Sequence, residues 1–309
     1  MTRPTVRVHR WRSAAAVTLR AGDLEATFLP ELGMTGVSLR WQGQELVAVP
    51  RGTRALTGGH TTGLPLLHPW ANRLAGRRYV ALGRAVDLRG LPLPTDANGL
   101  PMHGTMLGVE GWTIAFMEAG RRSARLQARF DYAGSFLDVA AFPFPHVVEI
   151  DAAVDGRQLV VSTVVRPLEG PVPVAFGWHD YFQLPGPRRT WRLGMPACEH
   201  LVLNRRMIPT GRRTAQAAED APIGDRTFDD GYALGDDRRF VLTGGRVRLE
   251  IELDGGYPYA QIWVPAGRPF ACIEPMVAPA NALASESYAL ATPDAPYAAT
   301  YTVRPTADS

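Results

Sequence analysis

Short runs of alternating apolar and polar residues recur along the chain, separated by glycine, proline, asparagine and aspartate. The clearest run is VVEIDAAVDGRQLVVSTVV (147–165), in which Asp155-Gly156 lies between two β-rich segments. This pattern predicts a hairpin with a type I′ turn. Segments 37–49 and 239–253 repeat the same device around glycine-containing turns. A chain built in this way is constrained to form antiparallel sheets.

No stretch shows the apolar periodicity of a helix of three turns or more, and the 31 glycines and 26 prolines suit many turns. We therefore predict an all-β protein, a large antiparallel β-sandwich formed by one domain over residues 1–309. Further strands are expected at 5–11, 24–30, 259–265 and 299–305. Three segments have loop character and are where function usually concentrates, namely 51–77, 89–111 and 204–237.

The basic residues are all arginine, and the absence of lysine excludes some chemistries. Without lysine there is no Walker A phosphate loop and no Schiff-base or pyridoxal-phosphate linkage. The arginines alternate with apolar residues, which favours a solvated sheet face over a nucleic-acid surface. No 18-residue apolar window and no signal-peptide core occur, and two cysteines are too few for a disulfide framework. We expect a cytoplasmic protein without a membrane or nucleic-acid partner, and a homodimer is left open.

Four stretches combine polar side chains with apolar surroundings, and together they could line a sugar pocket. Trp70 could cover a sugar's C–H face, while Asn72 and Arg73 could bind hydroxyl groups. His103 precedes Gly104, whose backbone freedom permits a close approach to a ligand. The sequences are LPLLHPWANRLAG (64–76), GLPMHGTMLGVEGW (99–112), FGWHDYFQL (176–184) and ACIEPMVAPANAL (271–283).

Two titratable residues of these stretches could carry chemistry. His179 stands in an apolar run, where burial favours the neutral imidazole. Strand alternation places Tyr181 on its face and turns Trp178 and Asp180 away. Glu274 at a strand end is a candidate base. Each residue type also has a structural alternative, such as a hydrogen-bonded core histidine or a surface glutamate, and spacing alone identifies no reaction.

At these residues the chain resembles the aldose 1-epimerase (galactose mutarotase) family, from about residue 20 to 305. PWANRLAG resembles the family's Asn-Arg loop, HG its first histidine motif, and HDYFQL its H-x-Y-F-N-L motif with Gln183 where asparagine is usual. FDDGYAL and AQIWVP resemble segments that hold a sugar-binding aspartate and a pocket glutamine, here Asp229 and Gln261. CIEPMVAPANAL is the most specific match, since it resembles the stretch with the catalytic glutamate.

The resemblance implies the galactose mutarotase-like supersandwich and the interconversion of α and β anomers of a free hexose, with no metal or cofactor. It implies that Glu274 deprotonates the anomeric hydroxyl and that His179 protonates the ring oxygen. Asn72, Arg73 and His103 would bind the sugar with the two pocket residues named above. The first loop lacks the fuller Gly-Arg-x-Ala-Asn-Arg form, which leaves sugar specificity open.

Three other hypotheses remain. One is a non-catalytic sugar-binding or sensor protein of the same fold, and another is a hexose-6-phosphate 1-epimerase, for which the arginine-rich turns at 204–207 and 210–214 offer a phosphate partner. The third is a metal-dependent β-sandwich enzyme using His68, His103 and His179, although these residues lack a tight ligand spacing.

Overall fold

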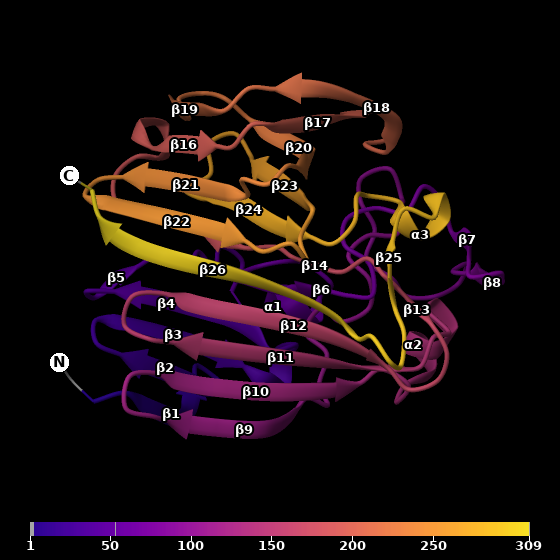
Figure 1. The fold of residues 1–309 in the computed structure, drawn as a ribbon, viewed down its shortest axis with the longest axis horizontal. Helices are drawn as coiled ribbons and strands as arrows, with labels where there is room; N and C mark the ends of the chain where they lie inside the picture. Colours follow the sequence, from indigo (N-terminus) through magenta and orange to yellow (C-terminus); the bar gives the residue numbers. More distant parts are fainter. Residues whose placement is uncertain (1–2, 53, 309) are drawn as a thin grey trace.

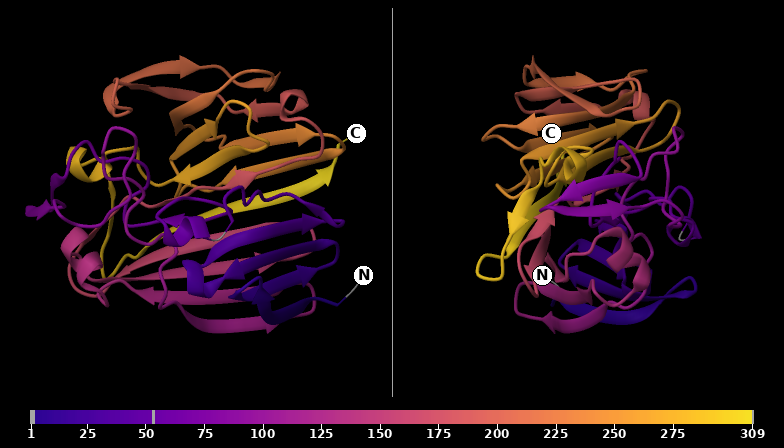
Figure 2. Two further views of the ribbon diagram at one scale, coloured as in Figure 1. Left: turned by 180° about the vertical axis from the view of Figure 1, so that it is seen from behind. Right: turned by 90° about the vertical axis from the view of Figure 1, so that its right-hand side faces the viewer.

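The computed structural model describes residues 3–52 and 54–308. Antiparallel strands form two large sheets and a five-stranded sheet that pack in layers (Figures 1 and 2). The predicted all-β supersandwich is confirmed.

A nine-stranded sheet runs the full height of the molecule in Figure 1. Strand alternation is clear in its central hairpin, where every second residue of both strands is buried. Burying one large aliphatic side chain stabilises the fold by about 1.5–3 kcal/mol, so this pattern fixes which face turns inward. In spatial order the strands are β19 (Glu219–Pro222), β16 (Arg192–Met195), β21 (Arg239–Gly244), β22 (Val247–Leu253), β26 (Tyr297–Ala307), β12 (Leu159–Pro167), β11 (His146–Val154), β10 (Ala124–Asp131) and β9 (Thr113–Ala119).

A five-stranded sheet lies behind the lower half of this sheet and packs against β9, β10 and β11 (Figures 1 and 2). Its strands are β1 (Thr5–Trp11), β2 (Ala14–Ala21), β3 (Leu24–Leu29), β4 (Thr35–Trp41) and β5 (Gln44–Glu45). The main hydrophobic core contains residues from Val17 to Val303, so both ends of the chain contribute to it.

An eight-stranded sheet lies behind the upper half of the nine-stranded sheet (Figure 1). Ile262 and Ile273, which pair with each other, turn from it into the main core, whereas the neighbouring pair Gln261 and Glu274 turns to the opposite face. In spatial order its strands are β18 (Pro209–Gln216), β17 (Cys198–Leu203), β20 (Phe228–Leu234), β23 (Tyr259–Val264), β24 (Ala271–Met276), β14 (Gly177–Trp178) and β6 (Leu66–Leu67), with β15 (Tyr181–Phe182) also paired to β24.

The remaining elements are short. Ser135 caps the six-residue helix α2 by accepting a hydrogen bond from the backbone nitrogen of Asp138. None of the helices in the described ranges is long and apolar enough to cross a membrane. These elements are α1 (Arg54–Thr57), α2 (Phe136–Ala141), α3 (Ala282–Ser285), the pair β7 (Arg78–Ala81) and β8 (Arg84–Asp87), the pair β13 (Val172–Val174) and β25 (Ala289–Ala291), and two 3₁₀ turns at Pro30–Leu32 and Arg188–Thr190.

Two sequence predictions about local structure were wrong. Segment 204–237 is not a loop but contains β18, β19 and β20, whose polar composition suits strands near the exposed end of a sheet. The β11–β12 hairpin forms as predicted, but without a type I′ turn at Asp155-Gly156, because Gly156 has a positive φ and Asp155 does not. The Asp155 backbone nitrogen donates to the Gln158 carbonyl oxygen at 3.3 Å, and the Asp155 carboxylate accepts hydrogen bonds from the backbone nitrogens of residues 157 and 158.

Candidate active site

The strand register of the eight-stranded sheet aligns four site positions in one row. Gly177 pairs with Met276 and Tyr181 with Cys272, so the same register places His179 opposite Glu274. Glu274 pairs in turn with Gln261, and Gln261 with Gly231. Directly opposed residues in an antiparallel pair share a face with Cβ atoms about 4.5–5.5 Å apart. The register therefore brings the imidazole and the carboxyl together although 95 positions of sequence separate them.

The sequence predicted that His179 lies within a strand, but it lies in the break between β14 and β15. Pro275 has no N–H, so the ladder with β24 is interrupted here. The His179 backbone nitrogen donates instead to the carbonyl oxygen of Pro65 at 3.1 Å. The predicted alternation still holds: the ring of Tyr181 stacks on that of His179 at 4.8 Å, while Trp178 packs in the core.

The pair at the centre of this row is close and buried. Nε2 of His179 lies 3.3 Å from Oε1 of Glu274, and their side chains are 7% and 2% exposed. The ring of His103 meets that of His179 edge-on at 5.5 Å, and Trp263 does so from another side at 5.6 Å. Three aromatic neighbours thus fix the orientation of the imidazole.

Loops 51–77 and 89–111 line the cavity together with the sheet and supply Asn72, Arg73 and His103. Asn72 and His103 both adopt left-handed backbone angles, and the His103 nitrogen donates to the Asn72 carbonyl oxygen at 3.0 Å. Gly104 packs so closely on the chain at His68 that a Cβ atom would lie 2.1 Å from the His68 carbonyl oxygen. Glycine is therefore required here by a backbone contact, which holds the His103 loop against the Asn72 loop.

A network of polar contacts holds the Arg73 guanidinium across the pocket. Nε donates to Asp96 at 2.9 Å, one terminal nitrogen donates to the Asn72 side-chain oxygen at 3.0 Å, and the other donates to Asp229 at 3.5 Å. Nε2 of Gln261 donates to the second oxygen of Asp229 at 2.8 Å. These contacts bring together all seven site residues expected from the sequence in one place.

Burial sets the protonation of the central pair. It raises the pKa of Glu274 well above its ordinary value, assisted by repulsion from Asp229 and Asp180. It also lowers the pKa of His179 to about 3. Burial thus favours a neutral carboxyl and a neutral imidazole, which share one transferable proton. Moving that proton from Glu274 to His179 leaves the charge of the pair unchanged, so the two groups titrate as a unit.

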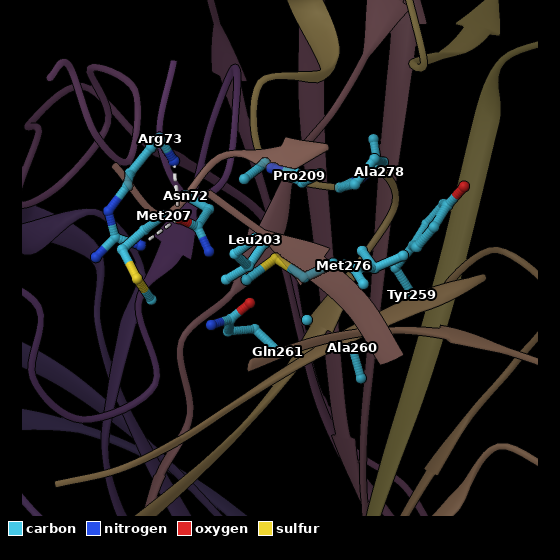
Figure 3. A pocket seen from close by; sticks show the side chains of 14 residues that line it. Asn72, Arg73, Leu203, Met207, Pro209, Tyr259, Ala260, Gln261, Met276 and Ala278 are labelled. Carbon is cyan, nitrogen blue, oxygen red and sulfur yellow. Dashed lines mark hydrogen bonds between the residues drawn. The ribbon is translucent and has the colours of Figure 1, made fainter. Parts of the chain in front are cut away.

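The site opens into a cavity of about 450 Å³. This volume is in the range of small-molecule sites, about 300–1,000 Å³. A smaller recess beside it shares Asn72, Arg73 and Gln261 (Figure 3). Met207 and Leu203, from the β17–β18 hairpin, give the recess an apolar side. The arrangement offers hydroxyl-binding groups around one proton-transfer pair.

The aldose 1-epimerase family model matches residues 15–303 of the chain. The protein belongs to the aldose 1-epimerase family. A galactose mutarotase-like protein from Clostridium acetobutylicum shares its fold with a TM-score of 0.86 at 17% identity, over 99% of both chains. Galactose 1-epimerase from Lactobacillus acidophilus NCFM has a TM-score of 0.80 at 12% identity, over 99% of this chain and 100% of its own. No curated protein matches the sequence significantly.

In this member of the aldose 1-epimerase family, Trp70 and His68 do not lie where the sequence analysis placed them. Trp70 does not cover the cavity, because it is 1% exposed and lies in the main core. Trp263 takes the place facing the cavity. His68 lies apart from the His103–His179 pair, since its Nε2 contacts Nε2 of His146 at 2.7 Å in the core. The structure therefore contradicts a metal site made of His68, His103 and His179.

Asp96 and Trp263 are site residues of this epimerase family member that sequence reasoning missed. Asp96 lies in a loop and fixes Arg73 through Nε, and nothing local in PTDANG distinguishes it from a turn aspartate. Trp263 could have been found, since it stands two positions after Gln261 in a strand and must share its face.

The carboxyl of Asp180, next to His179, leads to a prediction about stability. It is fully buried, Tyr301 donates to one oxygen at 3.5 Å, and burial raises its pKa well above the ordinary value. The unfolded chain releases this proton at lower pH than the folded chain. The contribution of Asp180 to stability therefore falls as pH rises above about 4, by about 1.4 kcal/mol per pH unit until its folded pKa is reached.

We expect Asp180→Asn to remove this part of the pH dependence and to gain stability relative to wild type as pH rises. Urea unfolding between about pH 5 and pH 8 measures the two slopes. Identical slopes for both proteins would contradict a protonated Asp180 in the folded chain.

Proposed function

We propose that the protein is a cofactor-independent aldose 1-epimerase that interconverts the α and β anomers of a free hexose. The observation that carries the proposal is the 3.3 Å contact between His179 and Glu274 in a buried row beside a sugar-sized cavity. Membership of the family supports the reaction class. The two unpaired cysteines are typical of proteins in a reducing compartment and support a cytoplasmic location.

Ring opening requires one base and one acid. When the sugar binds, its hydroxyl groups form hydrogen bonds in place of the water that the two buried side chains have lost. These hydrogen bonds stabilise the charged forms and so favour transfer of the shared proton from Glu274 to His179. The Glu274 carboxylate then removes the proton of the anomeric hydroxyl, while the His179 imidazolium protonates the ring oxygen. The C1–O5 bond breaks as the C1 carbonyl forms, and rotation about C1–C2 followed by the reverse transfers gives the other anomer. Proton count is conserved, so no external acid or base is needed.

The surrounding groups position the sugar. Arg73 and neutral His103 would donate to hydroxyl oxygens and stabilise charge on oxygen during opening. Burial lowers the pKa of His103 well below its ordinary value, with His179 and Arg73 adding repulsion. Asp229 and Gln261, which are hydrogen-bonded to each other, would bind adjacent sugar hydroxyls, with Asp229 accepting and Gln261 donating hydrogen bonds. Trp263 offers an apolar ring to the C–H groups of the sugar.

A phosphorylated hexose is the second candidate substrate. Arg51 lines the cavity, and among the described residues it has no ion-pair partner. A 6-phosphate could pair with it. A ratio of kcat/KM favouring hexose 6-phosphate over free hexose would select this substrate.

The test is anomer exchange measured by NMR or polarimetry on freshly dissolved α-D-glucose and α-D-galactose. Acceleration over the buffer rate supports the enzyme. Sugar binding without acceleration would leave a non-catalytic sugar-binding protein of the same fold.

The shared proton predicts an unusual pH profile. The pair gains a second proton only near the His179 pKa of about 3 and loses its single proton at the raised pKa of Glu274. We therefore expect kcat/KM to show no fall at the ordinary histidine pKa of about 6.5 as pH is lowered. Initial rates between about pH 4 and pH 9, corrected for buffer catalysis, measure this profile. An acid limb near the ordinary histidine value would contradict a neutral His179.

A further inference from the structure

A third metal-ligating side chain adjoins the proton-transfer pair. Cys272 lies two positions before Glu274 in β24, so both side chains turn to the same face of the strand. One donor atom from each of His179, Cys272 and Glu274 lies within 4.8 Å of the others, and all three residues are buried. The proposed reaction uses the imidazole and the carboxyl but not the thiol.

We propose that His179, Cys272 and Glu274 form a Zn²⁺ site at the edge of the cavity, whose lining includes His179 and Glu274. Tetrahedral zinc with bonds of about 2.0–2.3 Å places its ligand atoms roughly 3.3–3.7 Å apart. The His179 and Glu274 atoms already stand 3.3 Å apart. The sulfur needs a movement of about 1 Å to complete the set, which is within the range of a side-chain adjustment.

The donor set selects the metal class. Sulfur, imidazole nitrogen and carboxylate oxygen together suit zinc, whereas magnesium and calcium require oxygen ligands. Binding displaces the proton of the Cys272 thiol and that of the Glu274 carboxyl into solvent. The resulting thiolate and carboxylate balance the two positive charges of zinc, so the occupied site adds no net charge to a buried region. Phe270 and Tyr181 pack with Cys272 and close the sulfur side, which leaves the fourth metal position toward the cavity.

Zinc at this position would occupy both members of the proton-transfer pair. On the proposed function, it therefore inhibits anomer exchange and competes with the sugar. This consequence depends on the proposed reaction, but metal binding itself does not.

Direct binding tests the site without any need for activity. Wild type, Cys272→Ala and the control Cys198→Ala are titrated with Co²⁺, and Zn²⁺ is then added. Cys198 lies in β17 and outside the three-residue set. We expect wild type and the control to show tetrahedral d–d bands and a sulfur-to-cobalt charge-transfer band that zinc removes. Cys272→Ala should lack the charge-transfer band and bind zinc more than about 100-fold more weakly, beyond the ~10–100-fold effect of an outer-shell partner.

Anomer exchange provides the second readout. We expect Cys272→Ala to keep the basal rate and resist zinc, while wild type and Cys198→Ala are inhibited and recover with a chelator. Equal zinc affinity of wild type and Cys272→Ala, or no charge-transfer band in wild type, overturns the site whether or not the protein is active. An inactive wild type that shows the cobalt spectrum would remove the proposed function and leave the metal site standing.

Discussion

Glu274→Gln is expected to slow anomer exchange by about 10²–10⁴-fold, the usual contribution of a positioned proton-transfer group. Glutamine has nearly the same shape and polarity, but its amide cannot take up the anomeric proton or hand the shared proton to His179. Because burial raises the pKa of this carboxyl and so favours its neutral form, the substitution should leave stability near that of wild type. Exchange NMR with saturating sugar measures the loss of rate.

The matched control is Glu118→Gln, which makes the same change on the exposed strand β9. It should exchange anomers at the wild-type rate. Circular dichroism and urea unfolding of Glu274→Gln verify that it is folded. A folded Glu274→Gln protein with the wild-type rate would remove this carboxyl from the mechanism.

Gly104→Ala is expected to cost roughly 2–5 kcal/mol of folding stability and to abolish sugar binding. Its backbone angle φ is +69°, and left-handed geometry costs an alanine about 1–2 kcal/mol. The new Cβ would also overlap the His68 carbonyl, and overpacking typically adds about 1–3 kcal/mol. Relief of the overlap moves the loop and carries His103 away from His179. Chemical denaturation and sugar titration measure the two effects.

Gly99→Ala separates the two contributions, since its φ is +73° and nothing lies within 4 Å of the added atom. It lies in the same loop segment, and we expect a loss of only about 1–2 kcal/mol, with sugar binding retained. Equal losses in both variants would show that the contact with His68 carries no weight.

The sheet architecture could be predicted from sequence because its signals are local. Turn residues bound the strands, and period-2 burial marks their faces, as in β11 and β12. The same local signals misassigned 204–237, where polar strands such as β18 have mostly exposed side chains and lack the alternation. A polar strand is stabilised by its neighbour, which no short window of sequence reveals.

The positions of the candidate site residues followed from motif resemblance, but their geometry could not be predicted. That His179 faces Glu274 depends on the register of strands far apart in the chain, and register is a tertiary property. The support of Arg73 by Asp96 is of the same kind, since a loop aspartate has many possible partners. The sequence likewise carries no sign that His68 pairs with His146 in the core.

The place of β26 in the nine-stranded sheet bears on how the protein is made. This strand lies between β12 and β22, so it joins two halves that come from earlier parts of the chain. Until residues 297–307 leave the ribosome, each half exposes an open edge of unpaired backbone groups that invites association with other chains. In a nascent molecule both edges therefore stay unpaired until β26 is synthesised, and this one strand then pairs with both.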